Sequence, residues 1–203
     1  MHEIPLLSMR KFLFIAVTPL LLVGCQKSVY QADREALLQN PLYLEMYAEQ
    51  FVDTMVNLSI YQDPITQDEA KMKIVDKTKE YWLQKSAEAR KMQREGSKGA
   101  FIPMSEYTEG ETLFINNMIH MSPGFFVNPG PNLHVFLTQA VDPRDVEFPD
   151  VTAIDAGEIL VPYGAQSFAI DEEIEEPRLY RTVVLWDTDL ERLYGFAQIN
   201  PLY

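Results

Sequence analysis

Residues 182–197 have the sequence TVVLWDTDLERLYGFA, and this stretch decides how the C-terminal half of the chain folds. Its first and last parts are rich in β-branched and aromatic residues, which favour β-strands. The Asp-Thr-Asp sequence at 187–189 lies between them and is typical of a turn. The stretch therefore predicts two consecutive strands, at residues 180–186 and 193–199.

Short runs of the same composition precede this stretch, at residues 112–115, 133–137, 158–161 and 167–170. Turn signals separate the runs, among them Asn116-Asn117 and the Pro-Gly-Pro sequence at 129–131. No helical pattern lies between them. The strands therefore predict an all-β sandwich or a small barrel.

The run that begins at Leu133 has two different faces. Leu133, Val135 and Leu137 share one face, whereas His134 and Phe136 share the other. This alternation predicts a strand that is packed on one side and partly covered on the other. His134 is expected on the partly covered side.

The N-terminal half has a helical pattern instead. After Asn40-Pro41, apolar residues recur at steps of three and four and form one stripe, made of Leu44, Tyr47, Phe51, Met55 and Leu58. Asp63-Pro64 ends this pattern. A second helix is expected to begin at Thr66, with Glu69 completing a capping box. The Gly-Ser-Lys-Gly sequence at 96–99 is expected to end that helix and to form a hinge.

Cys25 is the only cysteine of the chain, and it closes a secretion signal. The charged start Met9-Arg10-Lys11 precedes an apolar run that is too short to favour a stable membrane span. The sequence Leu-Val-Gly-Cys at 22–25 resembles the lipobox of bacterial lipoproteins, which implies lipidation of Cys25 and anchoring by lipid. We expect the mature chain outside the cytoplasm, on the cell membrane or outer membrane. The alternatives are an uncleaved anchor helix or a signal that is cut elsewhere.

These patterns predict an α+β chain in four segments: a signal peptide at 1–24, a tether at 25–40, a helical hairpin at 41–95 and a β-domain at 96–203. The hairpin is expected to be a stalk or a packing partner between lipid and β-domain. The alternative is a hairpin that binds a helix of another envelope protein.

Charge divides the mature chain into two unlike parts. Residues 26–99 carry 11 Lys and Arg against 12 Asp and Glu, whereas residues 100–203 carry 17 acidic residues and four Arg. So acidic a part is repelled by phosphate backbones, which argues against nucleic-acid binding. The acidic surface is expected to serve solubility rather than to bind cations or a basic partner.

Two segments of the C-terminal half resemble the DM-thirteen domain, a β-rich extracytoplasmic module that is also called the electron-transfer DM-thirteen family. The sequence GPNLHVFL at 130–137 resembles the family's G-P-D-L-x-V-x-L signature, and residues 182–197 resemble its V-V-I-W-C-x-x-F-x-x-x-F-x-x-A segment. Shorter elements at 156–160 and 166–170 agree in order. The resemblance covers residues 96–199 and implies an extracytoplasmic β-domain.

One departure from the family decides the expected function. The family's cysteine, on which its redox proposal rests, falls at Asp187, and its two phenylalanine positions are Leu190 and Tyr194. A carboxylate cannot cycle between thiol and disulfide. Any thiol chemistry of the family is therefore lost in this chain.

No cofactor is expected, but the sequence leaves candidate metal ligands. Asp187, Asp189 and Glu191 alternate beside Trp186 and could converge on Ca²⁺, but acids at a strand end that face water are the preferred explanation. His134 and nearby carboxylates could bind a transition metal. His120 is expected to be a covered strand residue.

No sequence pattern indicates catalysis. The chain has no Gly-rich phosphate loop or nucleophile elbow, and Ser122 and Ser167 have no local sign of activation. We therefore expect a lipid-anchored envelope protein whose β-domain is a non-enzymatic binding or structural module. The alternative is a redox accessory protein that works through a bound metal, a haem or a partner.

Overall fold

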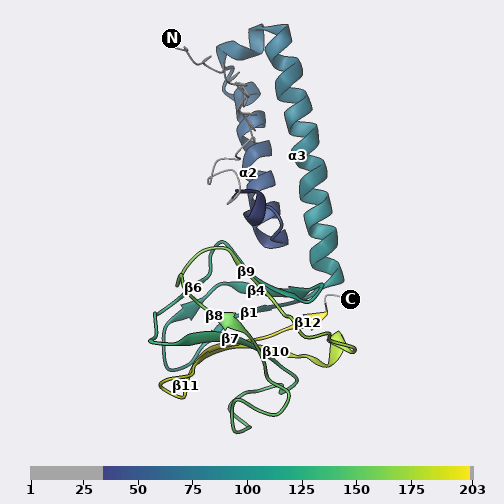
Figure 1. Ribbon diagram of the computed structural model, residues 1–203. Coiled ribbons are helices and arrows are strands. Elements are labelled where there is room, and N and C mark those ends of the chain that lie inside the picture. Colours follow the sequence, from purple (N-terminus) through teal and green to yellow (C-terminus); the bar gives the residue numbers. More distant parts are fainter. Residues whose placement is uncertain (1–33, 202–203) are drawn as a thin grey trace, which may run out of the picture.

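The computed structural model describes residues 34–201, so Cys25 and the lipobox lie outside the described residues. The chain is an α+β protein, as expected: helices occupy its N-terminal part and antiparallel sheets follow (Figure 1). Within residues 34–201, no helix is both long and apolar enough to span a membrane.

The helical hairpin consists of α2 (Pro41–Ile60) and α3 (Glu69–Glu95), which the single-turn helix η1 (Pro64–Gln67) connects. The Asn40 side chain begins α2 by accepting hydrogen bonds from the Leu42 and Tyr43 amides, at 3.0 and 3.3 Å. Between the helices, the Trp82 ring lies 5.1 Å from the rings of both Tyr47 and Phe51.

The expected start of the second helix at Thr66 is wrong by three residues. Thr66 lies in η1, where its hydroxyl donates to the Asp63 carbonyl at 2.7 Å. Asp68 caps α3 instead, because its carboxylate accepts hydrogen bonds from the Ala70 and Lys71 amides. Asp63-Pro64 thus begins a separate turn before the long helix starts.

The β part contains two five-stranded sheets, in which every neighbouring pair of strands is antiparallel. Sheet A has the order β12 (Asn200–Pro201), β1 (Ser97–Ala100), β4 (Glu111–Ile115), β5 (Met118–Met121) and β9 (Gln166–Ala169). Sheet B has the order β2 (Ile102–Pro103), β11 (Arg192–Gln198), β10 (Thr182–Asp187), β7 (Leu133–Thr138) and β8 (Ile154–Glu158). The small pair β3 (Thr108–Glu109) and β6 (Phe126–Val127) and the short helix η2 (Pro177–Leu179) complete the fold.

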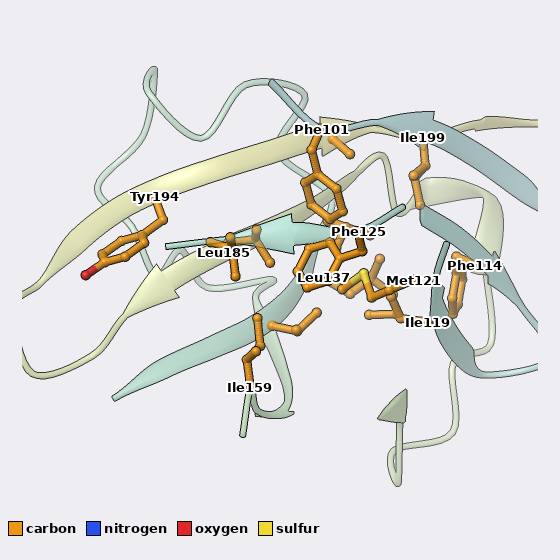
Figure 2. Packing of buried hydrophobic residues seen from close by; sticks show 14 of the residues in the cluster. Phe101, Phe114, Ile119, Met121, Phe125, Leu137, Ile159, Leu185, Tyr194 and Ile199 are labelled. Carbon is orange, nitrogen blue, oxygen red and sulfur yellow. The ribbon is translucent and has the colours of Figure 1, made fainter. Parts of the chain in front are cut away.

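The core lies between the two sheets, and neither sheet closes into a barrel among the described residues. Side chains that point inward from both sheets meet there, as Figure 2 shows for Phe114, Ile119, Met121, Leu137, Leu185 and Ile199. The predicted alternation along β7 is confirmed. Leu133, Val135 and Leu137 enter this core, whereas Phe136 packs on the other face of sheet B with Phe148, Val184 and Phe196.

Two expectations about the β part are wrong. The hinge expected at 96–99 is strand β1, which pairs with both β4 and β12. A Cβ atom on Gly99 would lie 2.2 Å from the Gln198 carbonyl oxygen, so this glycine permits a close approach of two backbones rather than a bend. The strand expected at 158–161 lies earlier, at Ile154–Glu158.

The hairpin stands on the outer face of sheet A. Leu42 and Met92 pack there against Leu113 and Ile115 of β4. The Asn40 amide, at the start of α2, donates to the carbonyls of Met121 and Gln166 at 2.8 and 3.1 Å. The end of α3 lies at the sheet as well (Figure 1). The start of α2 and the end of α3 therefore form the base of the hairpin, next to sheet A. Of the two expected roles, stalk or packing partner, this contact agrees with the packing partner, and the position of the lipid lies outside the described residues.

Candidate functional site

The two segments that carry the DM-thirteen resemblance meet at one end of sheet B. The loop before β7 contains Gly130, whose added Cβ would lie 2.2 Å from a carboxylate oxygen of Asp187 and 2.8 Å from the Tyr194 hydroxyl oxygen. Both partners belong to the hairpin of β10 and β11. A larger residue at this position would collide with Asp187 and Tyr194, so the position requires glycine. The loop packs directly on the Asp187 side chain.

Asp187 is completely buried, which contradicts the expectation that it faces water. One of its carboxylate oxygens accepts hydrogen bonds from the Asp189 and Leu190 amides, at 3.1 and 2.9 Å. The other accepts from the Asn132 amide at 3.3 Å. The carboxylate thus holds the β10–β11 turn and ties it to the loop before β7. Burial raises the pKa of the Tyr194 hydroxyl, and the charge of Asp187 raises it further.

His134 contacts the carboxylate of Asp155 directly and is connected to that of Asp189 through the side chain of Asn132. Its Nδ1 lies 2.9 Å from an Asp155 oxygen, and its Nε2 lies 3.0 Å from the side-chain oxygen of Asn132. The Asn132 amide nitrogen donates in turn to Asp189 at 3.1 Å, which fixes the direction of the amide group. Both ring nitrogens therefore lie within hydrogen-bond distance of side-chain oxygens.

The four candidate metal ligands do not converge on one point. Asp187 is engaged by backbone amides, Asp189 by Asn132, and His134 by Asp155 and Asn132. Glu191 is exposed at the turn, where its φ angle is 48°. Within residues 34–201, no group of three or more His, Cys, Asp or Glu side chains is arranged to hold a metal ion.

A hollow of about 930 Å³ opens beside this network. Phe148 and Trp186 line it, with ring centroids 5.2 Å apart, and Phe148 also packs against Phe136 at 5.5 Å. Acidic side chains at its edge include Glu147 and Glu191. An aromatic wall with an acidic edge can accept an uncharged or cationic group, and it disfavours anions.

Sequence reasoning missed a second pair of polar side chains, on sheet A. The register of β5 and β9 places His120 opposite Ser167, and the His120 Nδ1 lies 2.8 Å from the serine hydroxyl oxygen. Burial lowers the pKa of His120 to about 4, so the ring is neutral at neutral pH. Among the described residues, no carboxylate hydrogen-bonds this ring to orient it as a catalytic triad requires. The pair is better explained as a covered histidine whose polar atom is satisfied.

Comparison with known proteins finds no protein-family model, no curated protein and no solved structure that matches the chain. The DM-thirteen resemblance therefore stays a prediction that rests on residues 130–137 and 182–197. Only the register of the folded sheets brings these two segments together.

Proposed function

We propose that the chain is a lipid-anchored extracytoplasmic protein whose β part is a non-enzymatic binding or structural module. The observation that carries this proposal is the bonding of Asp187. The residue at the position of the resembling family's cysteine is a buried carboxylate that accepts three backbone hydrogen bonds. Such a group supports the structure of a turn, and it has no capacity for thiol chemistry.

The anchoring part of the proposal rests on the sequence at 22–25. Replacing Cys25 with Ser removes the only sulfhydryl that could receive diacylglycerol. The wild-type chain should incorporate labelled fatty acid and sediment with membranes, whereas Cys25→Ser should do neither. Equal labelling of the two chains would contradict the lipid anchor.

The outer face of sheet B supports a binding role. The hollow beside Trp186 combines an aromatic wall with an acidic edge, and the His134 network forms the neighbouring surface. This combination suits an uncharged or cationic ligand group of the cell envelope. It lies on the sheet face opposite the main core, so a bound ligand leaves the core undisturbed.

The hairpin supports a second role for the same protein, as a contact with another envelope protein. From its far end to the middle of α3, the hairpin carries exposed apolar side chains: Ile60, Tyr61, Ile74, Tyr81 and Leu83. Two isolated helices cannot bury such side chains against each other. A partner helix that packs on the hairpin would do so.

The redox alternative makes a different prediction for the purified full chain. Titration with haem, Cu²⁺ or Fe²⁺ should give neither stoichiometric binding nor a new visible absorbance band. One equivalent of bound transition metal that His134→Ala abolishes would overturn the non-redox proposal. Exposed Glu173 offers a matched control, because Glu173→Gln removes a charge far from His134 in the sequence.

A further inference from the structure

A second hollow, of about 440 Å³, lies at the junction between the hairpin and the β part. Four separate segments line it. They are the last turn of α3 with Arg94, the start of β1 with Ser97, the β4–β5 turn with Asn116, and the short helix η2 with Arg178. The hollow therefore exists only when the hairpin and the β part are assembled.

Among the described residues, the two arginines at this hollow have no ion-pair partner, unlike Arg144 and Arg192 of the β part. Arg144 pairs with Asp142, and Arg192 pairs with Glu106 at 3.0 Å. Within residues 34–201, neither Arg94 nor Arg178 forms an ion pair.

Further polar groups surround the two guanidinium groups. Asn116 is exposed in a turn where it and Asn117 have φ angles of 50° and 58°, and the Ser97 hydroxyl belongs to the same lining. Glu95 also lines the hollow, and its nearest cation is Lys91 at 3.9 Å. Buried Phe114 and Ile115 form the apolar part of the wall. Hydrogen-bond donors and cations therefore outnumber the single carboxylate.

We propose that this hollow binds a small anion, through a carboxylate or phosphate group held between Arg94 and Arg178. The planar guanidinium fork matches both groups, and charge-assisted hydrogen bonds to it are the strongest that a side chain offers. Arg94 alone has another explanation, because a cation is favoured in the last turn of a helix. Arg178 belongs to η2 and not to that helix, so the helix dipole does not explain its place in the same hollow. Two arginines from separate elements at one hollow point to a ligand.

The proposal concerns a different surface from the proposed function and does not depend on it. The Trp186 hollow has an acidic edge, whereas this hollow presents two free cations. A ligand here would touch both α3 and the β part, so binding would also hold the hairpin to the sheet. The bound anion should therefore raise the thermal stability of the whole chain.

The test is an amide chemical-shift titration of the full-length Cys25→Ser chain with inorganic phosphate and, separately, with citrate, in chloride-free buffer. Both probes should shift the backbone amides of Gly96, Ser97, Asn116 and Asn117 in a saturable manner. The relative affinities of the two probes identify the preferred group. The double variant Arg94→Gln/Arg178→Gln should weaken binding about tenfold or more.

Arg181→Gln is the matched control, because Arg181 is a second arginine of the β part without an ion pair and it does not line the hollow. This variant should bind as the wild type does, and it should keep the rise in melting temperature that the double variant loses. Equal shifts in all three chains, or shifts spread evenly over the surface, would overturn the proposal. Unchanged spectra of the wild type would also overturn it.

Discussion

The helical hairpin and the β part are stabilised in different ways. In the β part, residues from distant strands share one continuous core, in which Leu137, Val183 and Leu185 have no exposed surface. The hairpin has no such sealed core: Val75 is buried near its far end, but Ile74 and Tyr61 there are 65% and 78% exposed. Some of the charged pairs of the hairpin are local, such as Lys79 with Asp76 at 2.9 Å. Others join the two helices: Arg90 of α3 pairs with Glu45 of α2 at 2.7 Å and also with Glu49. Packing against sheet A therefore holds the hairpin at its base, and contacts between the two helices hold the rest of it.

The largest expected effect compares one leucine from each region. Leu185→Ala removes a side chain from the sealed core and should lower the free energy of unfolding by about 2–5 kcal/mol. Leu83→Ala removes the same atoms from a side chain of α3 that is 52% exposed, and it should cost less than about 0.5 kcal/mol. Urea denaturation of both variants measures the difference. Similar losses would mean that Leu83 is covered in solution.

The next effect tests the buried turn. Asp187→Ala leaves three backbone amides without their acceptor and should cost about 3 kcal/mol. Asp189→Ala removes an exposed carboxylate that accepts one hydrogen bond from Asn132, and it should cost less than about 1 kcal/mol. Urea denaturation of both variants ranks them. A cost for Asp187→Ala as small as that for Asp189→Ala would mean that the carboxylate does not hold the turn.

A smaller effect concerns pH at the junction of the two regions. Burial lowers the pKa of His120 to about 4, from 6.5 in the unfolded chain. The unfolded state therefore binds more protons, and stability should fall by about 2–3 kcal/mol as the pH drops from 6.5 to 4. Asp142, whose pKa Arg144 lowers to about 2, loses its contribution only below that window.

The His120→Gln variant isolates this effect, because glutamine keeps a polar side chain opposite Ser167 and does not titrate. Its stability should vary less between pH 6.5 and 4 than that of the wild type. Equal slopes of the two chains in thermal unfolding would mean that His120 is not the titrating group. The histidine faces the same side of sheet A as Leu113, its neighbour in β4, which packs against the hairpin.

The smallest free energy should be needed to open the tip of the hairpin. Residues 61–68 include Gln62, with a φ angle of 52°, and few of their contacts reach other parts of the chain. Proteinase K should cut there first, because exposed tips open locally at little cost. Lys98 is protected in β1 and pairs with Glu111 at 2.9 Å. A first cut at 96–99 would restore the hinge interpretation.

The sequence pattern predicts a strand correctly where the residue types that favour strands also lie in a covered sheet. The stretch at 182–197 forms β10 and β11 because its β-branched and aromatic residues fit a covered sheet. Strand β1 could not be predicted from local sequence. Gly99 suggests a hinge, but its role is to let the backbone at Gln198 approach closely, and only the fold shows that contact. Strand β5 (Met118–Met121) was missed, since four residues with two methionines carry no clear alternation.

The candidate site was harder to predict than the fold. The position of Asp187 at a strand end follows from the sequence, but its burial depends on Gly130 and Tyr194, which only the fold brings to it. The contacts of His134 with Asp155 and of His120 with Ser167 join residues that are 21 and 47 positions apart. Strand register creates both pairs, and no local pattern indicates them.

The double role of Asn40 would limit the distance between the β part and a membrane in a chain anchored through Cys25. This side chain caps α2 and also hydrogen-bonds to sheet A. The chain that precedes it therefore starts from the base of the hairpin. A lipid on Cys25 would therefore hold the β part through residues 25–40. Because residues 34–37 are helical, this segment reaches less than the roughly 50 Å of a fully extended chain of its length. The roughly 30 Å of helix in α2 adds nothing to that reach. In such an anchored chain, a longer hairpin would leave the distance between the β part and the bilayer unchanged, whereas a longer segment before Asn40 would increase it.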